Sequence, residues 1–208
     1  MNSLLSSDFL IQNNDILSSI LSIPNNIHDK KEDAQYKWVG IIDAYNKLNI
    51  PAERVLDIGC GFSSLPLYFA QRVKEVYAVE PGDIHDHARI LKEGGVNLIQ
   101  TKFELSDLPS NYFDVITDAC SMGCSMHLDT ALEIAYDKLK PGGYLISVGD
   151  SCLNQNTNYF ASPMYWKSTA EALGFHVGDL DIDETDKFFI IYNNYKLYIS
   201  RIILQKPL

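Results

Sequence analysis

The fold is decided by the stretch Val55-Leu56-Asp57-Ile58-Gly59-Cys60-Gly61-Phe62-Ser63. Its apolar first half predicts a short buried strand that contains one acid. Gly59 and Gly61 predict a tight turn, because residues without a Cβ adopt backbone angles that are closed to others. A helix is expected over residues 63–73, with Pro66 in the first turn, where a missing N–H costs little. Such a strand, turn and helix N-terminus form a pocket of backbone N–H groups suited to a nucleotide-like ligand.

The glycine spacing distinguishes between two kinds of cofactor. A dinucleotide site requires G-x-G-x-x-G, but Ser63-Ser64 stands where the third glycine belongs. The acid in the strand, Asp57, is also foreign to that pattern. Asp57-x-Gly59-x-Gly61 instead resembles the first motif of the class I S-adenosylmethionine-dependent methyltransferases, small-molecule branch. In that family the loop passes under the methionine part of the cofactor, and the acid helps to hold its amino group. The resemblance therefore implies an S-adenosylmethionine site that includes Asp57, Gly59, Cys60 and Gly61.

Composition excludes several classes of protein. The 208 residues are 46% hydrophobic and 21% charged, which predicts a single globular domain over residues 1–208. A net charge of −10 argues against a nucleic-acid partner. The four cysteines form no C-x-x-C pair, so we expect free thiols in a reducing cytoplasm and no metal site. No signal peptide or membrane span is predicted. We expect a cytoplasmic monomer or homodimer that acts on a small molecule.

Residues 1–49 are predicted to form a helical cap that precedes a core of residues 50–208. Apolar stripes over residues 10–21 and 32–48 indicate two helices, which a polar hinge separates. In one interpretation both helices cover a face and edge of the sheet. In the other, the first helix and the hinge form a lid that excludes water from the pocket. The lid would bring His28 and Tyr36 to the substrate.

The core pattern predicts strands that alternate with helices. Strands are expected over residues 75–79, 96–102, 112–118, 144–148, 175–182 and 187–204, with a hairpin turn at Asn193-Asn194. Phe113-Asp114 and Leu139-Lys140-Pro141-Gly142-Gly143 resemble further family landmarks, and the second is expected to stop a helix before the fifth strand. The resemblance implies an α/β fold, a Rossmann-like doubly wound sheet of seven mostly parallel strands with an antiparallel strand at one edge.

Two acids downstream of the glycines extend the predicted site. Glu80 ends the second strand about twenty residues after the glycines, where a carboxylate accepts hydrogen bonds from two ribose hydroxyls. That spacing also occurs in nicotinamide proteins, so it supports a ribose without naming the cofactor. The segment from Phe103 to Pro109 resembles the family segment that meets adenine. There the resemblance implies that Glu104 accepts from the adenine amino group and that Leu105 lends a backbone N–H.

The acceptor is expected beside the loop after the fourth strand, because chemistry in open α/β sheets gathers beyond the strand C-termini. His127 is predicted as general base, since imidazole titrates near neutrality; the alternative is a structural role at a helix start. Asp118 is predicted as a further catalytic and cofactor contact. Further predicted substrate contacts are Tyr36, Asp150 and Tyr159.

Three functions remain open on these residues. The first is methyl transfer from S-adenosylmethionine to a polar small molecule such as a sugar or other metabolite, to oxygen first and nitrogen next. The second is a nicotinamide oxidoreductase, which Ser63-Ser64 disfavours. The third is a non-catalytic ligand-binding protein, because fold does not fix function.

Overall fold

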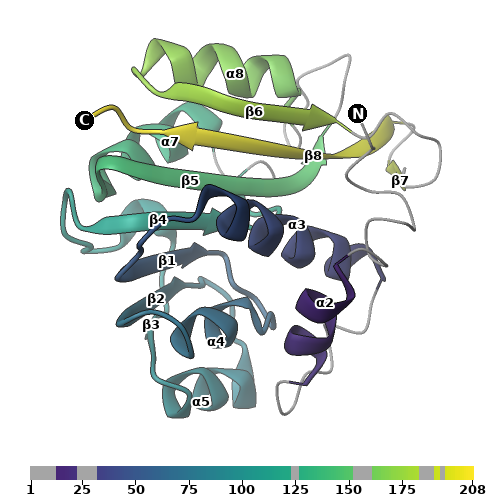
Figure 1. The fold of residues 1–208 in the computed structure, drawn as a ribbon, viewed down its shortest axis with the longest axis vertical. Helices are drawn as coiled ribbons and strands as arrows, with labels where there is room; N and C mark the ends of the chain where they lie inside the picture. Colours follow the sequence, from purple (N-terminus) through teal and green to yellow (C-terminus); the bar gives the residue numbers. More distant parts are fainter. Residues whose placement is uncertain (1–12, 23–31, 123–126, 152–160, 183–189, 193–194) are drawn as a thin grey trace.

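A mostly parallel sheet forms the centre of the molecule (Figure 1). The structure is a computed structural model that describes residues 13–22, 32–122, 127–151, 161–182, 190–192 and 195–208. In spatial order the strands are β3 (Val96–Ile99), β2 (Glu75–Val79), β1 (Arg54–Ile58), β4 (Phe113–Asp118), β5 (Leu139–Ser151), β8 (Tyr195–Gln205) and β6 (His176–Ile182). The Rossmann-like fold class is therefore confirmed.

The antiparallel strand lies one place in from the edge. β8 runs antiparallel to both β5 and β6, whereas the pairs among β1 to β5 are all parallel. β7 (Ile190–Tyr192) pairs with β8, and Tyr192 lies opposite Tyr195, which is the hairpin expected at this point. The strand order reverses between β1 and β4, and ligands of such sheets bind beyond the carboxyl ends of the strands at that reversal. That point is where the glycine loop begins.

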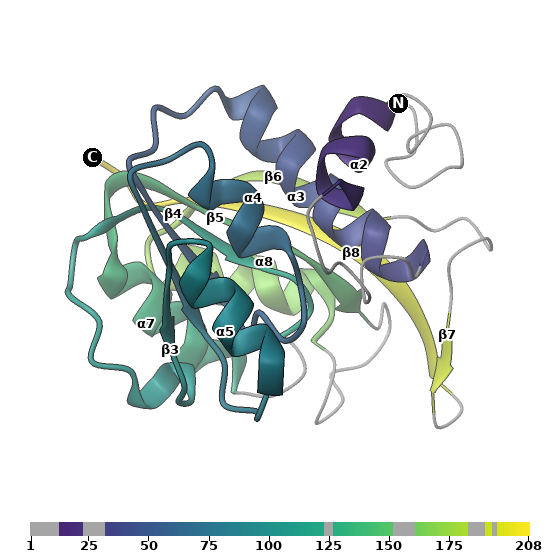
Figure 2. The ribbon, with the colours of Figure 1, turned by 90° about the horizontal axis from the view of Figure 1, so that it is seen from below.

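Helices cover both faces of the sheet and enclose two apolar cores (Figure 2). α2 (Asn14–Leu21), α3 (Glu32–Leu48), α4 (Leu65–Ala70) and α5 (His85–Glu93) lie on one face, and α7 (Leu128–Lys138) and α8 (Pro163–Ala172) on the other. α4 is shorter than predicted at both ends, and it begins only at Leu65, whose N–H donates to the Ser63 hydroxyl at 2.9 Å. β3 is shorter too, because residues 103–105 form a 3₁₀ turn.

The described part of the N-terminal cap packs as a covering layer. α3 contacts β5 and β8, and its Trp38, Val39 and Ile42 are buried in the core. α2 contacts α3 and α4, and the Arg72 guanidinium donates to the Ser19 hydroxyl at 3.0 Å. These contacts agree with the covering interpretation. The lid over the pocket stays a prediction, and residues 23–31, which include the hinge, lie outside the described part of the chain.

The Phe113-Asp114 motif and the motif that begins at Leu139-Lys140 meet at the end of the sheet remote from the glycine loop. The Asp114 carboxylate accepts from the backbone N–H groups of Glu53 at 2.9 Å and Arg54 at 2.8 Å, and from the Lys140 ammonium. Burial acts to raise the pKa of Asp114, but Lys140 and the two N–H groups hold it below its usual range. The motif does not precede β5 as expected. It lies within β5 as a bulge, because the register passes from Phe113↔Leu139 to Val115↔Tyr144. These motifs therefore join strands and do not touch the predicted cofactor site.

Candidate cofactor site

The glycine loop leaves β1 with two left-handed residues. Gly59 has φ +64° and Gly61 has φ +50°, a conformation that side chains with a Cβ rarely adopt. A Cβ on Gly59 would collide with the Cβ of Ser121, whereas one on Gly61 would meet nothing within 4 Å. Both positions require glycine for their backbone angles, and Gly59 also requires it for space. The open side of Gly61 leaves room for a ligand.

Glu80 lies across the glycine loop. Its carboxylate accepts from the Gly61 N–H at 2.8 Å and from the Gly82 N–H at 2.7 Å. It therefore joins the loop after β1 to the loop after β2. Each carboxylate oxygen keeps a second lone pair, so ribose hydroxyls could still donate to it. The ribose contact itself remains a prediction.

Asp57 is a buried acid beneath the same loop. It is 1% exposed, and the Thr117 hydroxyl donates to it at 2.6 Å. Burial raises the pKa of Asp57 to about 7, the Thr117 hydrogen bond opposes this rise, and the Asp118 and Glu80 carboxylates add to it. No described Lys, Arg or His forms an ion pair with Asp57. Such a carboxyl group is stabilised in its ionised form by a positively charged ligand.

Cys60 does not present a reactive thiol. Its side chain is 4% exposed and lies 3.7 Å from the Gly61 carbonyl oxygen. Burial raises the pKa of the Cys60 thiol far above its ordinary value, and nearby Asp57 and Glu80 raise it further. The thiolate is therefore disfavoured.

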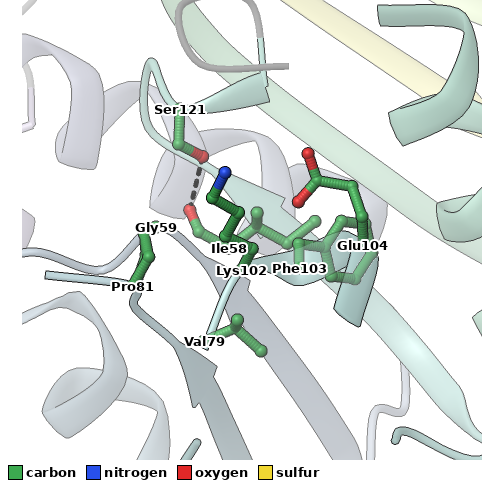
Figure 3. A pocket seen from close by; sticks show the side chains of 8 residues that line it. All are labelled: Ile58, Gly59, Val79, Pro81, Lys102, Phe103, Glu104 and Ser121. Atoms are coloured by element: carbon green, nitrogen blue, oxygen red, sulfur yellow. Dashed lines mark hydrogen bonds between the residues drawn. The ribbon is translucent and has the colours of Figure 1, made fainter. Parts of the chain in front are cut away.

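A pocket opens beside Gly59 between the ends of β1, β2 and β3 (Figure 3). Its lining residues are Ile58, Gly59, Val79, Pro81, Lys102, Phe103, Glu104 and Ser121. It holds about 70 Å³. Complete small-molecule sites span roughly 300–1,000 Å³, so this pocket can hold only one part of a cofactor. Its walls are mainly apolar and its rim is charged, which suits a heterocyclic base.

Of the two residues predicted to contact adenine, Glu104 lines this pocket and Leu105 does not. Glu104 lies on its rim in the 3₁₀ turn. Leu105 is 74% exposed and does not line the pocket, and its N–H donates to the Lys102 carbonyl at 3.0 Å. The predicted Leu105 N–H is therefore already engaged within the turn. Lys102 and Ser121 also line the pocket and were not predicted to, although both lie beyond strand ends at this edge of the sheet.

Asp118 requires a correction. It was predicted to contact substrate and cofactor, but it is 1% exposed and accepts hydrogen bonds from the Ser121 and Met122 N–H groups and the Ser147 hydroxyl. The single proton of the Ser121 hydroxyl lies within reach of both Asp118 and the Ile58 carbonyl oxygen. Its lone pairs therefore serve the loop after β4, and the carboxylate is not presented to a substrate.

The predicted substrate side is described only in part. His127 is exposed at the start of α7 and makes no side-chain cap hydrogen bond. Tyr36 lies in α3 and Asp150 in β5 opposite Ile199, but their side chains lie outside the description. Tyr159 and His28 lie outside the described residues altogether. All of these roles remain predictions.

Within the described residues, no group of three or more His, Cys, Asp or Glu side chains could hold a metal ion. Across that same part of the chain, no helix has the length and apolarity to span a membrane.

Fold and site together define a Rossmann-like domain with a pocket at the carboxyl ends of the strands, beside the point where the strand order reverses. Residues 56–147 match the family described as a methyltransferase domain. The chain is 35% identical over 105 residues to the ubiquinone/menaquinone biosynthesis C-methyltransferase UbiE of Ectopseudomonas mendocina (strain ymp), covering 46% of this chain and 41% of that protein. The chain thus spans less than half the length of that relative. The likeness of residues 56–147 to methyltransferase domains indicates the class I S-adenosylmethionine-dependent methyltransferases, whose cofactor is S-adenosylmethionine.

Solved structures show the same fold at low identity. The [4+2]-cyclase SpnF has a TM-score of 0.69 at 14% identity, covering 97% of this chain and 94% of its own. A Haemonchus contortus phosphoethanolamine N-methyltransferase in complex with S-adenosylhomocysteine has a TM-score of 0.66 at 16% identity, covering 82% of this chain and 52% of its own.

Proposed function

We propose that this protein transfers a methyl group from S-adenosylmethionine to a small-molecule acceptor. The observation that carries the proposal is Asp57, a buried carboxyl group with no cationic partner among the described residues, directly beneath the glycine loop. S-adenosylmethionine supplies a methyl group on a positively charged sulfur and carries a positively charged amino group. The unpaired acid suits that charge, and the open side of Gly61 leaves room for the ligand.

In the proposed reaction, the residues of this chain mainly hold the cofactor and the acceptor in place. In the proposal, the glycine loop and Asp57 hold the amino-acid end, Glu80 holds the ribose, and the pocket at Phe103 and Glu104 holds the base. Fixing an acceptor at attack distance contributes about 7–11 kcal/mol to lowering the barrier. A general base adds about 10²–10⁴-fold when the acceptor is a hydroxyl, and we propose His127 for that step.

Two acceptor classes are proposed. An oxygen acceptor, with nitrogen next, is our first candidate because His127 could take its proton. A carbon acceptor is the second, because the matched UbiE relatives are C-methyltransferases. Methyl release from labelled S-adenosylmethionine should be measured with a sugar, a phenol, an amine and an electron-rich ring. With a hydroxyl acceptor, His127→Ala should lower kcat at least about 100-fold and leave S-adenosylhomocysteine affinity unchanged. No methyl release with any acceptor class would contradict the proposal.

Cofactor affinity should depend on pH through Asp57. The pKa of Asp57 is raised to about 7, and a cationic ligand favours the ionised form. The affinity for S-adenosylmethionine should therefore fall as the pH drops below 7, approaching about tenfold per pH unit. Calorimetric titrations between about pH 5.5 and about pH 7.5, a range that spans the pKa of Asp57, measure this. Asp57→Asn should bind at least about tenfold more weakly at pH 7.5 and show a flat profile; a tight binder would remove Asp57 from the site.

The free energy of unfolding should depend on pH with the opposite sign to the cofactor affinity. The folded pKa of Asp57, about 7, lies above the unfolded value of about 3.9, so the folded state holds this proton more tightly. The stability that this group contributes is fully present below about pH 4 and is lost as the pH rises through 7. Asp57→Asn should therefore melt above the wild-type protein near pH 7.5 without ligand, while binding cofactor less tightly. A lower melting temperature for the variant at that pH would contradict the assignment.

A further inference from the structure

The loop that follows β4 is held by a buried carboxylate. One oxygen of Asp118 accepts from the N–H groups of Ser121 at 2.8 Å and Met122 at 2.9 Å. The other accepts from the hydroxyl of Ser147 on β5 at 2.7 Å. Because Asp118 is 1% exposed, these bonds form away from water, where leaving them unmade is costly. The first turn of the loop is therefore fixed to β4 and β5.

Ser121 extends this attachment to the glycine loop. Its hydroxyl lies within hydrogen-bond distance of the Asp118 carboxylate, and its oxygen is 2.7 Å from the carbonyl oxygen of Ile58. Figure 3 shows the Ser121 hydroxyl directed at that carbonyl on the wall of the pocket. The Ser121 Cβ also occupies the space that a side chain on Gly59 would need. One serine therefore sets both the last carbonyl of β1 and the clearance of the first loop glycine.

The backbone of Cys120, which lies close to Gly149, is consistent with this fixed first turn of the loop. Cys120 has φ +71°, a left-handed conformation that costs a residue with a Cβ about 1–2 kcal/mol. A Cβ on Gly149 of β5 would lie 2.9 Å from the Cys120 Cα. Such strained residues persist where the surrounding structure over-determines them, often at functional sites. Contacts with β1, β4 and β5 thus fix residues 120–122, the first turn of this loop.

We propose that the Asp118–Ser121 bridge, the contacts from Asp118 through Ser121 to Ile58, is a positioning device for the cofactor. It joins the loop on the acceptor side to the glycine loop, so that both present a fixed backbone before the cofactor arrives. Pre-organised loops bind more tightly because less ordering is needed on binding. This inference rests on the proposed function, and it makes Asp118 a positioning residue that accepts hydrogen bonds, not a base.

Two variants of Asp118 test whether its hydrogen bonds or its negative charge matter for cofactor binding. An asparagine amide oxygen can accept both loop N–H groups, and its NH₂ can donate to the Ser147 hydroxyl. Asp118→Asn should therefore bind S-adenosylhomocysteine within about threefold of the wild-type protein, whereas Asp118→Ala should lose about tenfold or more. An Asp118→Asn protein as weak as Asp118→Ala would overturn the bridge, because the charge itself would then be required.

A matched serine pair keeps the test decisive if Asp118→Ala does not fold. Ser121→Ala and Ser147→Ala each remove a hydroxyl with one proton to donate, so their melting temperatures should fall by similar amounts. Only Ser121→Ala also removes the contact to Ile58. Its dissociation constant for S-adenosylhomocysteine should rise about tenfold, against about twofold or less for Ser147→Ala. Equal affinities in the two variants would overturn the bridge alone, whereas a wild-type protein that does not bind S-adenosylhomocysteine would overturn the proposed function with it.

Discussion

Gly59→Ala should reduce the affinity for S-adenosylhomocysteine at least about 100-fold. The residue has φ +64°, and its new Cβ would collide with the Ser121 Cβ. The left-handed angle alone costs about 1–2 kcal/mol, and the collision forces the loop or its neighbour to shift. A loss of about 2.8 kcal/mol in binding free energy corresponds to about 100-fold in affinity. Calorimetric titration of the purified variant measures the loss.

Gly61→Ala is the matched control for that variant. Gly61 has φ +50°, but a Cβ there meets nothing within 4 Å of the protein. The variant adds backbone strain without the collision with Ser121, so it should lose less affinity than Gly59→Ala. Equal losses would show that backbone strain alone, and not the packing of Ser121 on Gly59, explains the result. A Gly59→Ala protein of normal affinity would contradict the described loop.

Asp43→Ala should destabilise the fold by about 3–5 kcal/mol. Asp43 on α3 is 5% exposed, and Arg201 on β8 is 7% exposed. Their atoms Oδ2 and Nη1 are 3.1 Å apart. Removing the carboxylate leaves the buried guanidinium without this compensating charge, which is far more costly than losing a surface pair. Urea unfolding followed by circular dichroism gives the free energy of unfolding.

Lys47→Ala supplies the control for the buried pair. The Lys47 ammonium lies 2.8 Å from the same Asp43 oxygen, but its side chain is 65% exposed. An exposed pair contributes at most about 1 kcal/mol, so this variant should unfold close to the wild-type midpoint. The double variant Asp43→Leu/Arg201→Met removes both charges, and it should recover much of the loss from Asp43→Ala. If Asp43→Ala unfolded like Lys47→Ala, the pair between α3 and β8 would not be a structural element.

Local chemistry explains why much of the fold was predictable. The apolar run before Gly59, the alternation of strands and helices, and the proline in the first turn of α4 each act within a few residues of sequence. The predicted bounds of α3, Glu32–Leu48, and of β2, Glu75–Val79, match the structure. Glu80 directly follows a strand, and this position alone predicted that it would lie at the glycine loop, where the Gly61 N–H donates to it.

What the sequence did not reveal depends on partners far along the chain. Asp118 was predicted as a substrate contact because it ends a strand, but Ser147, 29 residues away, helps to fill its carboxylate. Lys140-Pro141-Gly142-Gly143 follows the end of α7 as predicted, yet it lies within a bulged strand, where Asp114 holds Lys140, and not before that strand. Leu105 is the exception to this, because its N–H is engaged within the local 3₁₀ turn by Lys102. In each case a hydrogen-bond partner, and not the residue type, decided the role.

Titration of the wild-type protein with S-adenosylhomocysteine and, separately, with NAD tests the central claim most directly. We expect one molecule of S-adenosylhomocysteine to bind per chain, with affinity lost in Gly59→Ala, and NAD to bind at least about 100-fold more weakly because the third glycine of its motif is absent. Preferred binding of NAD, or no binding of S-adenosylhomocysteine, would contradict the account.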